Sequence, residues 1–319
     1  MKFIKELYKK AKDINGTIIL PEANLDSRVY DAAKQILKKE ISKIIVFGKF
    51  NEFDKDFNHP NCTIIDIPFY KDLEKLTNDL YELRKAKGLT LEDAKKLILD
   101  AGYFSMMLLK TGVADGVVAG AKWSTAQTLR PALQIIKTRK GKTCVTGSVL
   151  FIKDKHRPLV YGDCSLIENP TVEQLSEIAI SNAEFLEKVI GLTPKVAMLS
   201  YSTKGSAKHE MIDKVVNATK LAKSNSTYLI DGEMQGDSAL ELDTAKKKGI
   251  TSEVGGNANV LIFPDLNAGN IGYKLTATFG GFLAIGPIML NFNKPVNDLS
   301  RGCTVEEIIN TVCITKLQI

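Results

Sequence analysis

Short β-branched runs alternate with helical patterns along almost the whole 319-residue chain, and this alternation constrains the fold more than any other feature. The expected strands are Thr17–Leu20, Lys43–Phe47, Cys62–Ile65, Gly116–Ala119, Val145–Phe151, Leu159–Tyr161, Lys195–Leu199, Tyr228–Asp231 and Asn259–Phe263. The expected helices between them are Ser27–Lys39, Tyr70–Lys87, Leu91–Leu99, Thr125–Thr138, Val172–Lys188, Ala207–Lys223 and Met234–Lys247. Strands that alternate with helices form parallel sheets covered on both faces. The pattern therefore predicts an α/β fold, and the chain length favours two domains.

The basic turn Lys137–Lys142 is the expected first crossing between these domains. Beyond it, Val145–Phe151 and Leu159–Tyr161 are joined by the polar turn Lys153–Pro158. Two strands joined in this way predict an antiparallel hairpin, which we place at an edge of the second sheet.

Composition excludes several classes of protein. With 44% hydrophobic and 25% charged residues, the chain has the make-up of a soluble globular protein. The longest apolar run, Gly280–Leu290, is about half the length of a membrane-spanning helix. The start, Met1–Asp13, is charged and lacks the apolar core of a signal peptide. The cysteines form no Cys-x-x-Cys pair, which indicates reduced thiols and a cytoplasmic location (Cys62, Cys144, Cys164, Cys303 and Cys313).

The basic residues indicate small anionic ligands. The net charge is +6, but the lysines are spread along the chain and there is one Trp, which argues against nucleic acid. Only six of the 43 basic residues are arginines: Arg28, Arg84, Arg130, Arg139, Arg157 and Arg301. In so lysine-rich a chain, an arginine indicates a planar, two-point contact to phosphate or carboxylate. We expect roughly half of the six to have that function.

The junction after Gly116–Ala119 has the features of an anion site. A glycine turn leads to Ser124 and Gln127, which fit a capping box at the start of a helix that carries Arg130. Free N–H groups and the positive end of the helix dipole attract anions there. Ser124, Thr125 and Arg130 are therefore expected substrate-binding residues. A plain capped helix with a surface arginine explains the same residues equally well.

Two later strand ends also carry polar residues. The loop Ser200–Ser206 supplies hydroxyl groups with Lys204, Gly205 and Ser206, although the spacing is not that of a Walker A loop. After Asn259–Phe263, Asp265 and Asn267 are placed to meet a ligand. Capping and turn formation are the alternative roles of both segments.

The segment Lys294–Asn310 is the most specific part of the sequence. Its run Pro295-Val-Asn-Asp-Leu-Ser-Arg-Gly-Cys303 resembles the signature of the phosphotransacetylase (phosphate acetyl/butyryltransferase) family. The resemblance covers nearly the whole chain through further motifs in the family's order: Leu20-Pro-Glu with Asp26 and Arg28, Ala114–Ala121, Ser124–Ile136, Met198–Ala207, Asp231-Gly-Glu and Asn259–Lys274.

The resemblance implies a fold and an assembly. Family members have two α/β domains, each with a largely parallel sheet flanked by helices, in an isocitrate/isopropylmalate dehydrogenase-like architecture with the active site in the interdomain cleft. The implied domains are residues 1–139 plus 297–319, and residues 140–296. The family also implies a homodimer and metabolic pairing with acetate kinase, whereas composition and charge argue against a membrane or nucleic-acid partner.

The resemblance further implies a phosphate acetyltransferase, an acyltransferase that interconverts acetyl-CoA plus phosphate with coenzyme A plus acetyl phosphate. Its catalytic residues would be Ser300 as a donor to the reacting centre, Arg301 on the phosphate and Glu307 as the base for the thiol. Arg84 would also contact the phosphate or acyl end, and Arg130 coenzyme A. The thiolate would attack the acyl carbon directly. No cofactor or metal is expected, since coenzyme A is a substrate and His59, His156 and His209 have no metal-ligand spacing.

The sequence departs from the family at two positions. Glu307 stands where the family usually has Asp, and a shift of the carboxylate by about 1 Å can cost on the order of 100-fold in rate. Glu307 also completes a capping box with Thr304, and Glu306 beside it is the alternative base. Trp123 stands where the family more often has His, and packing against adenine and simple surface packing are both open.

Several alternatives remain open. Cys303, at a helix start beside Arg301, would be stabilised as a thiolate and could form an acyl-cysteine. A propionyl- or butyryltransferase is the closest enzymatic alternative. A catalytically silent acyl-CoA sensor is the alternative from another class. A dehydrogenase is disfavoured because no Gly-x-Gly-x-x-Gly follows any strand.

Overall fold

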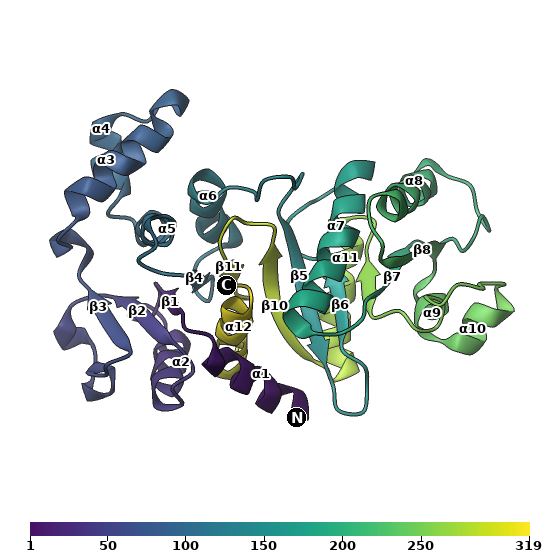
Figure 1. The fold of residues 1–319 in the computed structure, drawn as a ribbon, viewed down its shortest axis with the longest axis horizontal. Coiled ribbons are helices and arrows are strands. Elements are labelled where there is room, and N and C mark those ends of the chain that lie inside the picture. Colours follow the sequence, from purple (N-terminus) through teal and green to yellow (C-terminus); the bar gives the residue numbers. More distant parts are fainter. The chain divides into compact units, whose positions relative to one another are not determined.

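The computed structural model describes residues 1–319 and divides into two compact units (Figure 1). Residues 2–137 and 292–319 form the discontinuous unit, and residues 138–291 form the continuous unit, with Met1 grouped with the latter. The family resemblance implied a second crossing at 296/297. The chain returns earlier because Pro295 already accepts a hydrogen bond from the N–H of Val117 in the first sheet.

The discontinuous unit contains a five-stranded sheet in the order β11-β4-β1-β2-β3, and every neighbouring pair is parallel. Its strands are β1 (Thr17–Leu20), β2 (Lys43–Phe47), β3 (Cys62–Ile65), β4 (Gly116–Ala119) and β11 (Val296–Asp298). Its helices are α1 (Lys2–Asp13), α2 (Ser27–Lys38), α3 (Leu73–Arg84), α4 (Leu91–Leu97), α5 (Ala101–Thr111), α6 (Thr125–Ile135) and α12 (Val305–Leu317). Since all strands are parallel, the loops after β1, β4 and β11 leave from the same edge of the sheet.

Helix α12 is the central helix of this unit. It packs against α1 and α2 and against β4, and most of its residues from Ile308 to Lys316 are buried. Even the Lys316 ammonium is buried, where it donates to the carbonyl of Ile41 at 2.8 Å. A segment from residues 292–319 therefore completes a core that residues 2–137 begin.

The continuous unit contains a six-stranded sheet in the order β10-β5-β6-β9-β7-β8. Its strands are β5 (Thr146–Ile152), β6 (Leu159–Gly162), β7 (Lys195–Leu199), β8 (Leu229–Met234), β9 (Val260–Ile262) and β10 (Leu283–Leu290). Its helices are α7 (Val172–Phe185), α8 (Glu210–Ser224), α9 (Gly236–Leu240), α10 (Leu242–Lys247) and α11 (Leu266–Gly280). The β6, β9, β7 and β8 pairings are parallel, so the predicted α/β class, with largely parallel sheets flanked by helices, is confirmed.

Three details of the prediction are wrong. The antiparallel β5–β6 hairpin is present, but it lies inside the sheet because β10 adds to β5 as the edge strand. Helix α8 begins at Glu210, not Ala207, since His209 caps it through Nδ1 and the N–H of Met211. The expected helix Met234–Lys247 is the end of β8 followed by two short helices.

None of the helices combines the length and the apolar character that crossing a bilayer requires. The apolar run Gly280–Leu290 instead ends α11 and forms the edge strand β10.

Candidate active site

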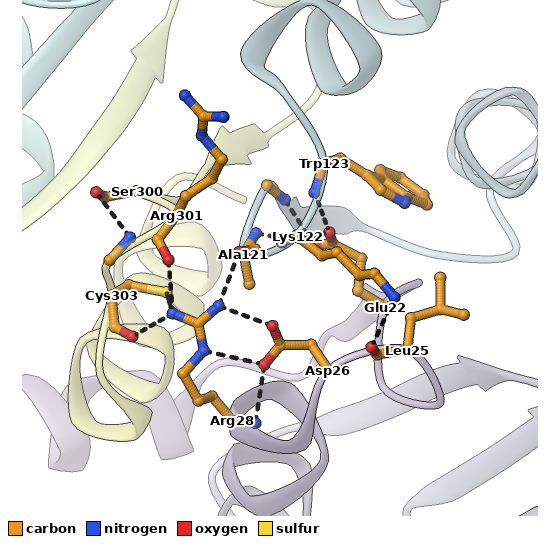
Figure 2. A network of polar contacts seen from close by, with 12 residues as sticks. Glu22, Leu25, Asp26, Arg28, Ala121, Lys122, Trp123, Ser300, Arg301 and Cys303 are labelled. Carbon is orange, nitrogen blue, oxygen red and sulfur yellow. Dashed lines mark hydrogen bonds and ion pairs between the residues drawn. The ribbon is translucent and has the colours of Figure 1, made fainter.

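Glu22 organises the loop that follows β4. Its side chain is 0% exposed and accepts hydrogen bonds from four consecutive backbone N–H groups (Figure 2). Oε2 accepts from residues 120 and 121 at 2.6 and 3.0 Å, and Oε1 accepts from residues 122 and 123 at 2.8 and 2.7 Å. Bonds from N–H groups to an ionised carboxylate are among the strongest in proteins. Glu22 therefore fixes residues 120–123 just before the start of α6.

Arg28 joins three loops at the carboxyl edge of the sheet. Its Nη1 donates to the carbonyls of Arg301 and Cys303, each at 2.8 Å, and its Nη2 donates to the carbonyl of Ala121 at 2.8 Å. The same guanidinium pairs with Asp26, whose pKa is lowered chiefly by this hydrogen bond. Asp26 also caps α2 by accepting from the Arg28 N–H at 2.9 Å. Arg28 thus holds backbone in place, and sequence reasoning had not assigned it this role.

The six arginines divide into two groups. Arg28 and Arg157 donate to backbone carbonyls, and Arg139 pairs with Glu184 at 3.1 Å. The other three have no hydrogen-bond or ion-pair partner for the guanidinium: Arg84, Arg130 and Arg301. These are the three that the family resemblance assigned to substrate, and all lie in the discontinuous unit.

Two of the unpaired arginines share a neighbour. Burial raises the pKa of Tyr103 on α5, and the positive charges of Arg84 and Arg130 both act in the opposite direction on that phenol. The Tyr103 hydroxyl donates to Gln134 Oε1 at 2.9 Å, which ties α5 to α6. Arg84 at the end of α3 and Arg130 on α6 are therefore both close enough to Tyr103 for their charges to act on it.

The turn after β11 presents Ser300 and Arg301. The Ser300 carbonyl accepts from the Cys303 N–H at 2.9 Å, and the Ser300 hydroxyl accepts from the Gly302 N–H at 3.3 Å. Figure 2 shows the Arg301 carbonyl facing Arg28, whereas the Arg301 guanidinium extends away from this network. The turn is held through its backbone, which leaves the Arg301 side chain available to a ligand.

Glu307 lies at the start of α12 in the expected capping box, which is confirmed. Its Oε2 accepts from the Thr304 N–H at 2.7 Å and the Thr304 hydroxyl at 3.2 Å, and the Glu307 N–H donates to that hydroxyl at 3.2 Å. In this state the carboxylate satisfies the helix end. Both bonds are made by Oε2, so Oε1 remains available to accept a proton.

Cys303 does not have the character that the sequence suggested. Its side chain is 4% exposed, and burial raises the pKa of the thiol to about 11, although the charge of Arg28 acts in the opposite direction. The prediction of a stabilised thiolate is therefore wrong, because desolvation outweighs the nearby positive charge.

The first turn of α6 is also defined by side-chain bonds. Ser124 caps the helix, with its N–H bonded to Gln127 Oε1 at 2.9 Å and its hydroxyl accepting from the Gln127 N–H at 3.3 Å, so this capping box is confirmed. The Thr125 hydroxyl donates to Asp298 Oδ2 at 2.9 Å. Thr125 therefore links α6 to the end of β11.

In the continuous unit, the predicted loop residues bond to other protein groups. Lys204 pairs with Asp231 at 2.6 Å, and the Gly205 N–H donates to the buried Glu233 at 2.7 Å. Burial raises the pKa of Asp231, but hydrogen bonds from Lys204 and Ser252 outweigh it and leave that pKa lowered. These bonds fix the loop three residues before α8 begins, so the loop does not form the N-terminus of that helix.

The remaining predicted residues of this unit have simpler surroundings. The Ser206 hydroxyl accepts from the Thr203 N–H at 3.0 Å. Asp265 caps α11 by accepting from the Ala268 N–H at 3.0 Å, as turn chemistry alone suggests. Asn267 is exposed, and its side chain makes no bond within the protein. No group of three or more His, Cys, Asp or Glu side chains is arranged to hold a metal ion.

Unpaired arginines, a capped helix start and a serine turn at the carboxyl edge of a parallel sheet define an α/β enzyme of anionic substrates. The chain belongs to the family described as Phosphate acetyl/butaryl transferase, whose sequence model matches residues 2–316. Members of this family are acyltransferases.

Individual relatives match over their full length. The chain is 47% identical to a phosphate acetyltransferase of Acetivibrio thermocellus, covering 100% of this chain and 98% of the relative. It is 43% identical to that of Bacillus subtilis, covering 96% and 95%. A phosphotransacetylase structure from Streptococcus pyogenes superposes with a TM-score of 0.92 at 42% identity, covering 99% of this chain and 98% of the other.

A more distant likeness concerns the fold alone. A 4-hydroxythreonine-4-phosphate dehydrogenase structure from Klebsiella pneumoniae superposes with a TM-score of 0.55 at 11% identity, covering 95% of this chain and 98% of the other. The architecture is therefore shared with a dehydrogenase.

Proposed function

We propose that this chain catalyses the reversible reaction of acetyl-CoA with phosphate to give coenzyme A and acetyl phosphate. The observation that carries the proposal is full-length similarity, at 47% identity, to a protein named phosphate acetyltransferase. The three unpaired guanidiniums support it, since both substrates carry phosphate groups that arginine binds in a planar, two-point manner.

The proposed step is a direct transfer in a ternary complex. The coenzyme A thiol gives its proton to Glu307, and the thiolate attacks the carbonyl carbon of acetyl phosphate. A carbon–sulfur bond forms, the carbon–oxygen bond to phosphate breaks, and phosphate leaves with that electron pair. A thiol with a pKa near 8.5 is mostly protonated at pH 7, so a base is needed. No cofactor takes part.

Other residues bind and orient the substrates in this proposal. Arg301 and Arg84 would neutralise the phosphate, Arg130 would bind coenzyme A, and Ser300 would donate to the reacting centre, where a positioned donor stabilises developing charge. The proposal retains a set of further substrate-binding residues: Ser124, Thr125, Lys204, Gly205, Ser206, Asp265 and Asn267. Of the residues in the continuous unit, Asn267 has a side chain that makes no hydrogen bond within the protein.

Two alternatives have specific support. The family description names a butyryl as well as an acetyl activity, which favours a longer acyl group as the second candidate. The capping bonds of Glu307 favour an acyl-CoA sensor without turnover, because they give one oxygen of the proposed base a structural role.

Purified protein mixed with acetyl phosphate and coenzyme A tests the proposal by thioester absorbance. Propionyl and butyryl phosphate run in parallel, with Ser300→Ala and Arg301→Ala as controls. Rapid acetyl transfer that both variants lose is the expected result. Faster butyryl transfer would make the longer acyl group the substrate. Coenzyme A binding without transfer of any acyl group would leave the sensor.

The proposal includes a homodimer formed through α11. Three residues four positions apart make an exposed apolar stripe on this helix: Ile271 (58% exposed), Leu275 (52%) and Phe279 (84%). Only Gly269 of the 15-residue helix is buried. A twofold interface must pair one surface with itself. A stripe centred on Leu275 meets this need, since Ile271 of one copy would face Phe279 of the other in an antiparallel arrangement.

Sedimentation of the Leu275→Asp variant tests this interface. We expect a dimer for the unmodified chain and a monomer for the variant, because a charge would be buried at the centre of the contact. The control is Leu99→Asp, which changes a similarly exposed leucine in the other unit. A dimer that survives Leu275→Asp would refute this interface. A cytoplasmic location and pairing with acetate kinase, which would supply or consume acetyl phosphate, complete the proposal.

A further inference from the structure

Asp298 links the end of β11 to the first turn of α6. It is the last residue of β11, stands two positions before Ser300, and is 2% exposed. Its Oδ2 accepts the hydrogen bond from the Thr125 hydroxyl at 2.9 Å. A carboxylate beside a helix N-terminus is stabilised by the free N–H groups and the dipole there. The bond therefore fixes the Ser300–Arg301 turn relative to α6.

Gly120 permits this arrangement. Its φ of +106° suits glycine, and a Cβ there would collide with Asp298 Oδ1 and lie 2.8 Å from the Leu299 N. The loop held by Glu22 can thus lie directly against the Asp298 carboxyl group. The carboxyl group is enclosed by the loop after β4 on one side and by α6 on another.

Two buried oxygen atoms at this place have no hydrogen-bond partner: Asp298 Oδ1 and Thr128 Oγ1. The Thr128 hydroxyl lies close enough to lower the pKa of Asp298, although no well-formed bond joins the two groups. Buried polar atoms without partners are uncommon in folded proteins, and each costs roughly 1–3 kcal/mol. A cost of this size beside the serine turn needs an explanation beyond packing.

We propose that Asp298 is a positioning residue for the transfer reaction, and that its ionised carboxylate, through Thr125, holds the Ser300–Arg301 turn in its active position. The inference rests on the proposed function. When Oδ1 takes up a proton it gains a donor, for which Thr128 Oγ1 is the nearby acceptor. The Thr125 bond then goes to a neutral group and weakens, since bonds to ionised acceptors are roughly twice as strong.

Asp298 changes its protonation state within the range of pH in which enzyme kinetics can be measured. Burial raises the pKa of Asp298 to about 6, and the negative charge of Glu22 acts in the same direction, whereas the hydrogen bond from Thr125 and the nearby Thr128 hydroxyl and Leu299 N–H lower it. We therefore expect the turn to be held above about pH 6 and to loosen below it.

The inference revises the substrate-binding role proposed above for Thr125, because it assigns the Thr125 hydroxyl to Asp298 and not to a substrate. Loss of this hydroxyl should lower kcat, because the turn is displaced, and should leave KM for coenzyme A and acetyl phosphate unchanged. A substrate-binding hydroxyl would give the opposite pattern, with a raised KM.

The test combines kinetics with amide hydrogen exchange of residues 299–303, for Asp298→Asn, Thr125→Val and the unmodified chain from about pH 5 to 8. The control is Thr219→Val, which removes the hydroxyl of a buried threonine on α8 of the other unit. We expect kcat of the unmodified chain to fall below about pH 6. Both variants should lose on the order of tenfold in kcat at pH 7, and residues 299–303 should exchange faster. The Asn variant should also lack the acid limb near pH 6.

Unchanged exchange in both variants, an acid limb that persists in Asp298→Asn, or a Thr125→Val variant changed only in KM would each overturn the inference. If the unmodified chain transfers no acyl group, the proposed function fails. Exchange of residues 299–303 still decides whether Asp298 holds the turn.

Discussion

The guanidinium of Arg28 and the carboxylate of Asp26 form a two-point ion pair, through Nη2 and Oδ2 at 2.7 Å and through Nε and Oδ1 at 3.0 Å. The pair orients Arg28 so that its remaining N–H groups reach three backbone carbonyls. A planar guanidinium can make all these bonds together, but a lysine ammonium cannot.

We therefore expect Arg28→Lys to slow acetyl transfer by on the order of tenfold or more, since the Ser300–Arg301 turn loses its backbone anchor. The matched control is Arg157→Lys, because Arg157 also donates to three backbone carbonyls, in the continuous unit. Each variant should lower the urea midpoint, but only Arg28→Lys should lower kcat. Equal loss of activity in both would mean that stability alone explains the effect.

Glu307 is expected to act as the base in spite of its capping role. Glu307→Gln should reduce kcat by on the order of 100-fold or more, which is typical of a lost general base. Its stability should change little, because Gln also suits a capping box. Thr304→Ala removes the capping hydroxyl and should cost about 1 kcal/mol of unfolding free energy while activity persists. If Glu306→Gln is the inactive variant instead, Glu306 is the base.

Arg84 and Arg130 should differ in the substrate that they bind. We expect Arg130→Ala to raise KM for coenzyme A, and Arg84→Ala to raise KM for acetyl phosphate, each by about tenfold or more. Arg139→Ala is the control, since that guanidinium pairs with Glu184. A rise in KM for coenzyme A alone in both variants would show that the two arginines serve one substrate.

Asp298 makes stability depend on pH in a defined direction. Its pKa is raised to about 6, so the protonated carboxyl is favoured in the folded state. The stability this provides is complete below the unfolded pKa near 4 and is lost as pH rises through about 6, which amounts to roughly 3 kcal/mol. The free energy of unfolding of Asp298→Asn should not fall in this way as the pH rises. Fluorescence of Trp123, the one Trp, reports urea unfolding of this unit at pH 4 and 7. If the free energy of unfolding changed by the same amount between the two pH values in both proteins, the prediction would be contradicted.

Cys303→Ala should retain near-normal turnover. The buried thiol, with its pKa raised to about 11, holds almost no thiolate at neutral pH. The Arg28 contact to the Cys303 backbone carbonyl is unaffected by the change. Burst kinetics and mass measurement after mixing with acetyl phosphate should show no acyl-protein. An acetylated Cys303 would restore the covalent alternative.

Local features could be predicted from the sequence, because their causes lie within a few residues. The capping boxes of α6 and α12 each join residues three apart. The strands Thr17–Leu20 and Lys43–Phe47 were also predicted with their observed bounds, because β-branched, buried runs are bounded by turns.

The network around the candidate site could not be predicted in this way. Glu22 bonds to Gly120, 98 positions away, and Arg28 bonds to Arg301, 273 positions away. Each residue looks ordinary in its own neighbourhood, and only the parallel order of β1, β4 and β11 brings their loops together. The pairing of Lys204 with Asp231 escaped prediction for the same reason.

Helix α5 and strand β10 were missed for a different reason. The residues of α5 are mostly apolar and buried, so they show little helical periodicity, and β10 is a continuous apolar run. Periodicity cannot distinguish a buried helix from a buried strand in such segments.

The discontinuous unit also has a consequence for biosynthesis. A ribosome makes residues 138–291 before it makes residues 292–319, so the continuous unit can fold while the first sheet still lacks β11 and α12 (Figure 1). Until then one side of β4 is unpaired, and the apolar faces that α12 covers on α1 and α2 are exposed. The unit that is begun first is therefore completed last. A nascent chain whose residues up to 291 have just left the ribosome would carry one unit that can fold and one that still requires a chaperone or its own remaining residues.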